Sequence, residues 1–334
     1  PDFFKLELCF HRWIHLIQLV KSGLQLSNEE LFNMRALQLV APKTVELRIV
    51  DDPPEPGPDE VLVRMRAVGL CGSDMHIYTD GGIAGYLVNE YPIVMGHEPA
   101  GIIAEIGSGV QNLSIGTRVV VEPTITCGLC ASCLEGRLNL CENALFMGGI
   151  QLPGSLREYA VVPARNVMAI PDSMSFVDGV VVEPLAVLLH MLELAKLEKG
   201  ETVAVMGAGP IGLLASAVAK QSGASMVVVA DRITKRLDLA KRFGADETVD
   251  YTKSSVSDVV HDVTDGKGAH VVVDTAANVN SMRNAVSAAR NGARLVIIGI
   301  SSQSEVAFPV WDAMSKELSF YIQKRSNQND HEAI

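Results

Sequence analysis

The second half of the chain alternates short hydrophobic runs with segments of helical periodicity. The runs lie at residues 202–206, 226–230, 270–274 and 294–298. Apolar runs without polar alternation are typical of strands that are buried on both faces of a parallel sheet. The helical patterns lie between the runs, at residues 211–222, 234–243, 256–264 and 281–290. This order predicts a doubly wound parallel sheet with helices on its faces.

The pattern from Met34 to about Arg165 is different, because short strand-like segments are separated by glycine and proline. Strands are predicted at residues 61–68, 101–107, 117–121 and 159–162, which indicates a compact all-β domain. A helical pattern over residues 185–197 joins the two halves. We therefore expect an α/β protein with a mostly-β domain at 34–185 and a parallel-sheet domain at 186–320. Residues 1–33 fit neither pattern and form an extension of unclear role.

The amino-acid composition argues against two classes of protein, nucleic-acid-binding proteins and membrane-spanning proteins. The 334 residues include 28 lysines and arginines against 39 aspartates and glutamates, which gives a formal net charge of −11. Binding to nucleic-acid phosphates normally requires the opposite sign, so we expect no DNA or RNA partner. The longest uncharged apolar stretch, residues 203–219, is broken by glycines and a proline and is shorter than the about 20 residues that a membrane span needs. We expect a soluble, cytoplasmic protein without a secretory signal.

Four of the six cysteines fall in one segment with the spacing Cys127-x2-Cys130-x2-Cys133-x7-Cys141. Two-residue spacings allow neighbouring thiolates to turn toward one tetrahedral zinc ion. An iron–sulfur cluster is a competing interpretation, but the bacterial cluster pattern ends in x3-Cys-Pro, which this segment lacks. Ordinary thiols are the third interpretation. Zinc held by four thiolates has no open coordination position, so the predicted site is structural.

A glycine motif follows the first hydrophobic run of the second half. Gly207-Ala-Gly209-Pro-Ile-Gly212 stands between a predicted strand and a predicted helix, and Asp231 ends the next strand. In this context the glycines allow a tight turn, approach of the backbone to a pyrophosphate and close helix packing. Asp231 can accept hydrogen bonds from a ribose diol and would repel a 2′-phosphate, so we expect NAD. Arg236 is expected at the same site, and with Arg232 it leaves NADP as the alternative.

Three further segments carry residues of the kinds that bind metals: 69–76 (GLCGSDMH), 96–101 (GHEPAG) and 183–187 (EPLAV). Together with the cysteine cluster and the glycine motif, in this order, they resemble the zinc-dependent medium-chain alcohol dehydrogenase family. The resemblance covers residues 34 to about 325 and is strongest to the sorbitol (polyol) dehydrogenase branch. It implies a GroES-like catalytic domain followed by a Rossmann domain.

The resemblance also implies roles for individual residues. It assigns Cys71, His97 and Glu98 to a catalytic zinc, and it leaves Glu183 either to hold the zinc-bound water or to enter the coordination shell. Ser73 and His76 match the proton relay of the family. Phe146 and Arg325 match substrate-pocket positions of the polyol branch, whereas Lys324 replaces a residue that is often aromatic there.

The predicted function is zinc- and NAD-dependent oxidation of a secondary hydroxyl of a polyol to a ketose. A catalytic zinc with three protein ligands keeps one position open and favours the ionised form of a bound hydroxyl. An L-threonine or 2,3-butanediol dehydrogenase would use the same residues, and a non-catalytic relative is a third alternative. By resemblance we also expect a dimer or tetramer, and we expect residues 321–334 to begin a return to the catalytic domain that is cut short.

Overall fold

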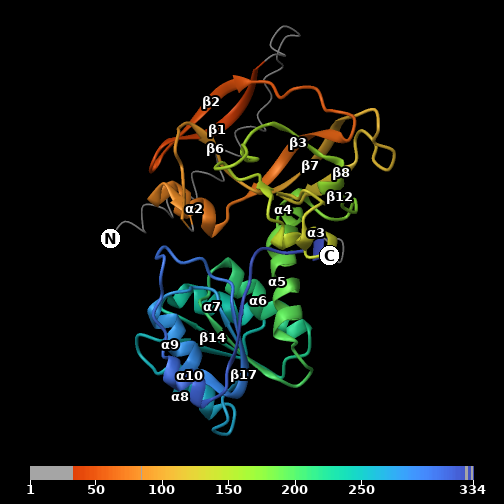
Figure 1. Cartoon of the computed structure of the whole chain (residues 1–334). Helices are drawn as coiled ribbons and strands as arrows, with labels where there is room; N and C mark the ends of the chain where they lie inside the picture. The colour runs from red at the N-terminus through yellow and green to blue at the C-terminus, as the bar shows by residue number, and fades with distance from the viewer. Residues whose placement is uncertain (1–32, 84, 328–329, 332–333) are drawn as a thin grey trace.

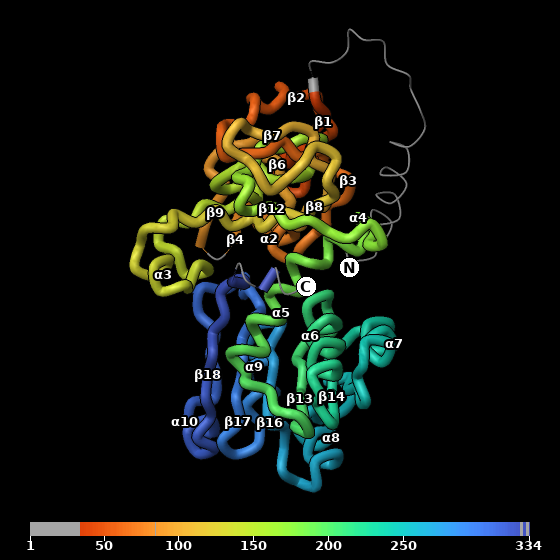
Figure 2. Tube along the Cα trace, turned by 90° about the vertical axis from the view of Figure 1, so that its right-hand side faces the viewer, coloured from red at the N-terminus to blue at the C-terminus, as the bar shows by residue number. Residues whose placement is uncertain are grey.

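The computed structural model describes residues 33–83, 85–327, 330–331 and 334. The expected extension at 1–33 lies outside this part of the chain except for Asn33. Figure 1 shows two lobes, with the orange and yellow N-terminal part in the upper one and the cyan and blue part in the lower one. The end of the chain lies at the junction between the lobes in both views (Figures 1 and 2).

The first lobe is built mainly from two antiparallel sheets, with the strand orders β11-β3-β7-β8-β12 and β2-β1-β6. Their strands are β1 (Asn33–Ala41), β2 (Thr44–Asp51), β3 (Glu60–Gly69), β6 (Ile93–Val94), β7 (Glu98–Ile106), β8 (Arg118–Val121), β11 (Tyr159–Pro163) and β12 (Val167–Ala169). Two small hairpins pair β4 (Gly82–Ile83) with β5 (Tyr86–Leu87) and β9 (Thr124–Ile125) with β10 (Leu145–Phe146). The alternation that predicts the strand at 61–68 buries Val61 and Val63 against Ile103 and Val119.

Short helices lie between these strands, so the lobe is not all-β but mostly β, as the expected fold class states. The described helices of the lobe are α2 (Gly72–Asp80), α3 (Ala131–Leu134), α4 (Phe176–Gly179) and two 3-10 turns, η1 (Leu138–Leu140) and η2 (Ala164–Asn166). Helix α2 begins after Cys71, whose backbone N–H donates a hydrogen bond of 3.0 Å to the Asp74 carboxylate. Such a bond satisfies one of the backbone donors that a helix start leaves free.

The second lobe contains a parallel six-stranded sheet with the order β15-β14-β13-β16-β17-β18. Its strands are β13 (Thr202–Met206), β14 (Met226–Asp231), β15 (Glu247–Asp250), β16 (Ala269–Asp274), β17 (Ala289–Ile297) and β18 (Ser319–Ile322). Its helices are α6 (Pro210–Gln221), α7 (Thr234–Arg242), α8 (Val256–Asp262), α9 (Val279–Ala288) and α10 (Val310–Ser315). The predicted doubly wound fold is confirmed, and Figure 2 shows β18 at the outer edge of the sheet, beside α10.

Helix α5 (Val182–Ala195) joins the lobes, as its periodicity predicts. It begins at the junction and packs on α6 and β17 of the second lobe (Figure 1). Glu183 lies in the first turn of α5. Its carboxylate is therefore held at the junction by a helix that packs against the second lobe. No helix among the described residues is long and apolar enough to cross a membrane.

Candidate active site

A cavity of about 370 Å³ lies between the two lobes and is lined from both sides. The first lobe contributes Cys71, His97 and Glu98, and the second contributes Ile211 and Ile298. The volume is in the range typical of sites for small ligands. The turn after β13, which has β14 on one side and β16 on the other, leads into α6, whose Ile211 lines this cavity. Parallel sheets bind their ligands at such a position, at the carboxyl ends of the strands.

The structure brings together the three side chains predicted to hold the catalytic metal. One ligand atom each of Cys71, His97 and Glu98 lies within 4.8 Å of the others. Cys71 precedes α2, His97 precedes β7, and Glu98 is the first residue of β7. A thiolate, an imidazole and a carboxylate at the wall of a cavity form a donor set that suits zinc with one position left for a substrate.

Backbone geometry explains how Glu98 reaches this position. Glu98 pairs with Gly69 across β7 and β3. A Cβ atom on residue 69 would lie only 2.1 Å from Glu98 Oε2, so only glycine leaves room for the carboxylate.

Asp74 positions the other two residues predicted to bind the metal, and its role is absent from the sequence prediction. It is buried, and one of its oxygens accepts the backbone N–H of Cys71. The other oxygen accepts the backbone N–H of Gly96 at 3.1 Å and lies 3.6 Å from His97 Nδ1. The only sequence signal for it is its place between Ser73 and His76 in the segment that carries Cys71.

The electrostatics of the site favour a bound cation. Burial raises the pKa of Glu98 to about 7, and the negative charge of Glu183 adds to the shift. Burial also raises the pKa of Glu183. Burial alone would lower the pKa of His97, but Asp74 and Cys71 outweigh it and raise that pKa well above its ordinary value. Buried carboxylates that resist ionisation in this way are stabilised by a bound metal ion.

The remaining residues predicted by resemblance lie around the same cavity, with one exception. Ser73, Phe146, Glu183 and Arg325 line it. The Phe146 ring is 5.1 Å from the His97 ring, and the Arg325 guanidinium carbon lies 4.6 Å from the centre of the Phe146 ring. His76 is not part of the lining but stands on α2 with its side chain 31% exposed and Nδ1 3.3 Å from Asp80 Oδ2.

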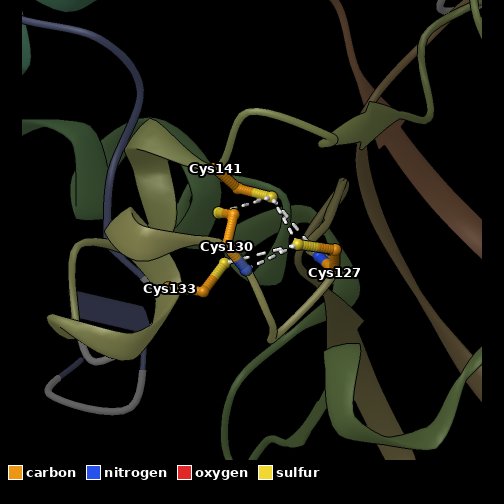
Figure 3. A group of neighbouring side chains, drawn as sticks. All are labelled: Cys127, Cys130, Cys133 and Cys141. Atoms are coloured by element: carbon orange, nitrogen blue, oxygen red, sulfur yellow. Dashed lines mark hydrogen bonds between the residues drawn. The ribbon is translucent and has the colours of Figure 1, made fainter.

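The four clustered cysteines converge in space as well as in sequence (Figure 3). Their sulfur atoms approach one another at 3.5 Å between Cys127 and Cys141, 3.9 Å between Cys130 and Cys141 and 4.0 Å between Cys127 and Cys133. Hydrogen bonds from the backbone N–H groups of Leu129 and Cys130 lower the pKa of Cys127 to about 6, whereas burial raises the pKa of Cys133 to about 12. Four sulfurs at these separations fit a closed tetrahedral metal site.

The glycine motif forms the turn between β13 and α6, as predicted. A Cβ on Gly212 would lie 1.9 Å from the Gly207 carbonyl oxygen, so glycine is required for the close approach of α6. A Cβ on Gly209 would meet no atom within 4 Å, which leaves space above the helix N-terminus for a phosphate.

Asp231 stands at the end of β14 and is buried beside this turn. Its Oδ2 accepts the Ala208 N–H at 2.7 Å, and its Oδ1 accepts the N–H groups of Arg232 and Ile233 at 2.7 and 2.9 Å. Each carboxylate oxygen can accept more than one hydrogen bond, so the position still suits a ribose diol. Arg236 lies in the first turn of α7, half-buried.

A buried carboxylate that sequence analysis does not single out organises the same edge of the sheet. Asp274 ends β16 with no exposed surface. It accepts the N–H groups of Ala276 and Ala277 at 2.9 and 3.0 Å and the Ser281 hydroxyl at 2.9 Å. The neighbouring Thr275 hydroxyl donates to the Met206 carbonyl at 2.9 Å, so this loop supports the turn that begins at Gly207.

Two family models match the chain. The alcohol dehydrogenase GroES-like domain matches residues 57–172, and the zinc-binding dehydrogenase model matches residues 210–333. The first confirms the fold class that we expected for the N-terminal lobe. Both agree with the order in which the two lobes occur along the chain.

Individual relatives agree with these matches. The chain is 39% identical over 290 residues to sorbitol dehydrogenase of Bacillus subtilis, a match that covers 86% of this chain and 81% of the relative. It is 37% identical over 306 residues to D-xylulose reductase of Saccharomyces cerevisiae, with 90% and 85% covered. A solved zinc-binding dehydrogenase from Sinorhizobium meliloti, bound to NADP, is 34% identical with a TM-score of 0.81, and the match covers 90% of this chain and 87% of that one. The chain therefore belongs to the zinc-dependent medium-chain alcohol dehydrogenase family, in agreement with the resemblance that its motifs show.

Proposed function

We propose that this protein oxidises a secondary hydroxyl of a polyol to a ketone and transfers the hydride to NAD. One observation carries the proposal: the cluster of Cys71, His97 and Glu98 lines the same cavity as Ile211 and Ile298, which follow β13 and β17 in the nucleotide-binding lobe. A hydroxyl held at the cluster therefore lies beside the sheet edge where this fold presents a nicotinamide. The carbinol C–H bond breaks, its hydrogen and electron pair pass to the nicotinamide ring, and the hydroxyl proton leaves toward solvent.

The side chains divide this work between them. Zinc held by Cys71, His97 and Glu98 supplies the positive charge that favours ionisation of the substrate hydroxyl. Glu183 lines the cavity, and its carboxylate is placed to accept a hydrogen bond from the hydroxyl or from water. Ser73 receives the proton at the wall of the cavity, and His76, partly exposed on the same helix, passes it to solvent.

A polyol is the substrate class that the lining and the relatives support. The two relatives named above are a sorbitol dehydrogenase and a D-xylulose reductase. Polar side chains of Gln151, Gln323 and Arg325 line the same cavity. Within the described residues, Gln323 Oε1 and Arg325 Nη1 are buried without a hydrogen-bond partner, and hydroxyl groups along a carbon chain would supply such partners.

We propose NAD rather than NADP, although the Sinorhizobium meliloti structure holds NADP. The support comes from the chain itself, because a buried Asp231 at the end of β14 favours a ribose diol and repels a phosphate in its place. Arg232 is exposed and Arg236 only half-buried, so neither is fixed in the turn as Asp231 is.

The test is NADH formation across sorbitol, xylitol, L-threonine and 2,3-butanediol, with and without a strong chelator. We expect turnover of polyols that chelation abolishes, while titration of the demetallated protein with NAD still shows binding. Preferential turnover of L-threonine or 2,3-butanediol would contradict the polyol assignment and favour the alternative, an L-threonine or 2,3-butanediol dehydrogenase. No turnover of any alcohol by the zinc-loaded protein would favour a non-catalytic relative.

We also propose that residues 34–185 and 186–320 are the two domains, and that the protein is a cytoplasmic homo-oligomer. Free thiols at metal-type spacing are typical of a reducing compartment.

The outer edge of the parallel sheet supports association of subunits, because Trp311, Met314 and Ile322 are 74%, 59% and 80% exposed there. Sedimentation of the purified protein would give the number of subunits.

A further inference from the structure

Three consecutive residues after the last strand line the active-site cavity. Strand β18 ends at Ile322, and Gln323, Lys324 and Arg325 all belong to the lining. In an extended chain successive side chains point to opposite sides, so three in a row require a break in the backbone pattern. Arg325 provides it with a left-handed φ of +56°, a conformation that non-glycine residues rarely adopt and that clusters at functional sites.

Hydrogen bonds hold this segment in place. The backbone N–H of Gln323 donates to the Ile297 carbonyl at 3.0 Å, and its side-chain amide donates to the Arg325 carbonyl at 3.0 Å. Asn139, which lies between the last two cysteines of the four-cysteine cluster, donates to the Lys324 carbonyl at 3.1 Å. The two cationic side chains therefore stand on a backbone that both lobes fix.

Among the described residues, neither of these cationic side chains forms an ion pair. Arg325 stacks on Phe146, and its Nη1 atom is buried without a hydrogen-bond partner in the described part of the chain. The carboxylates of Glu122 and Glu183 are near enough to act on its charge, but neither forms an ion pair with it. Lys324 is exposed at the cavity, and among the described residues it forms no ion pair.

We propose that Lys324 and Arg325 form a subsite for an anionic group at the far end of the substrate. A guanidinium and an ammonium together recognise a carboxylate or a phosphate through charge-assisted hydrogen bonds, which are stronger than those to a neutral hydroxyl. This inference rests on the proposed function and specifies its substrate: a polyol that carries a carboxylate or a phosphate ester.

The distance between the two ends of the cavity fits such a substrate. The Phe146 ring is close to both His97 and Arg325, 5.1 Å from the His97 ring and 4.6 Å from the Arg325 guanidinium carbon. His97 and Arg325 are therefore separated by no more than the sum of these distances, which a chain of a few carbons spans. The oxidised carbon would lie at the metal cluster and the anion beside Lys324.

The experiment compares kcat/KM of the zinc-loaded protein for three matched substrates. These are sorbitol, the sugar acid with the same carbon chain, and the terminal phosphate ester of sorbitol. We expect at least a tenfold preference for one of the anionic substrates, with a KM that rises with ionic strength. Comparison of the sugar acid with the phosphate ester shows whether the site binds a carboxylate or a phosphate. In Lys324→Met the preference should fall about tenfold or more, and Lys324→Arg should retain most of it. Lys199→Met removes an exposed lysine that is not among the residues lining this cavity, and it should leave the preference unchanged.

The outcomes separate this inference from the proposed function. Equal or better turnover of sorbitol than of both anionic substrates would overturn the anion subsite and leave the polyol dehydrogenase intact. An anionic preference that survives Lys324→Met unchanged would also overturn it. Absence of turnover with all three substrates would instead contradict the proposed function. Lys324 is exposed, so its replacement is not expected to unfold the protein, and the melting temperature of each variant checks this.

Discussion

Asp74 Oδ1 lies 3.6 Å from His97 Nδ1, and both side chains are almost completely buried. The separation is longer than a hydrogen bond, and the same oxygen accepts one from the backbone N–H of Gly96. Asp74 therefore fixes the backbone before His97 and places a negative charge beside its imidazole. Its second oxygen fixes the start of α2 at Cys71. One carboxylate thus positions Cys71 and His97, two residues predicted to bind the metal that are far apart in sequence.

Replacing Asp74 with asparagine should weaken zinc at the active site about 10–100-fold, because partners that orient metal ligands typically contribute that much. The amide retains an acceptor but loses the charge, and one of the two backbone donors is left facing an NH₂ group. Competition with a chelating dye measures the affinity. Asp80→Asn, on the same helix but exposed, is the control, and its zinc affinity should match the wild type. Unchanged affinity in Asp74→Asn would remove the positioning role.

Glu183 and Cys71 should respond differently to conservative replacement. Three ligand atoms converge without Glu183, so we place Glu183 beside the metal rather than on it. Glu183→Gln should keep zinc and lower turnover about 10–100-fold, whereas Cys71→Ser should lose most of the zinc. Metal analysis and kcat of both variants decide the matter. Equal loss of zinc from the two variants would make Glu183 a ligand.

Replacing Asp231 with serine should weaken NAD binding about ten- to a hundred-fold, since a hydrogen bond from the ribose to a charged group typically contributes about 1.5–3 kcal/mol. The same change removes the negative charge that disfavours a 2′-phosphate, so discrimination against NADP should relax. Titration with both dinucleotides gives the two affinities. If the wild type already prefers NADP, the role of Asp231 is wrong and an arginine such as Arg236 reads the phosphate.

Asp274 should support both stability and dinucleotide binding. Asp274→Ala leaves two backbone N–H groups and the Ser281 hydroxyl without their buried acceptor, so the free energy of unfolding should fall by at least about 1–3 kcal/mol. NAD affinity should fall about tenfold, or about 1.4 kcal/mol, because the loop supports the turn at Gly207. Asp274→Asn retains an acceptor and should bind NAD nearly as the wild type does. Equal NAD affinity in the alanine variant would restrict Asp274 to a structural role.

The same residue predicts a pH dependence of stability. Burial raises the pKa of Asp274, although the hydrogen bonds from Ala276, Ala277 and Ser281 oppose the shift. A raised pKa means that the folded state holds the proton more tightly than the unfolded state does. The resulting stabilisation is fully present below the ordinary pKa of about 3.9 and is lost as pH rises through the folded-state pKa. Urea unfolding across this range should show a smaller loss of stability with rising pH in Asp274→Asn than in the wild type.

Four of the six strands of the second lobe are predicted from sequence because they contain apolar runs, whereas β15 and β18 are absent from the prediction. The strand at 202–206 is placed to the residue, and Asp231 falls at the end of its strand as expected. The least accurate boundary is β17, which begins at Ala289 rather than at residue 294. Ala289 pairs with Ala269 of β16, but the residues up to Arg294 fall in a register shift and include Arg290, Asn291 and Gly292, which carry no apolar pattern.

The first lobe and the site show where the sequence is insufficient. Helix α2 is missing from the prediction because its nine residues carry no apolar face, and capping by Asp74 supports it instead. The structure brings Cys71, His97, Glu98 and Glu183 to one cavity, but motif resemblance alone had grouped them. Gln323 and Arg325 both line the cavity because the chain after β18 includes a left-handed residue, Arg325. Hydrophobic periodicity does not predict such a residue.

The close approach of Gly69 to Glu98 has a consequence for how this site can change in evolution. With 2.1 Å between a Cβ at residue 69 and the Glu98 carboxylate, any larger residue at 69 displaces that carboxylate. Substitution at 69 therefore becomes acceptable only after residue 98 has become smaller, and the order of the two mutations is constrained. A descendant that had exchanged Glu98 for a short side chain would be free to vary at 69, and every later substitution there would make a return to glutamate harder. Gly69 therefore restricts which residues can follow glutamate at position 98, the third residue predicted to bind the metal.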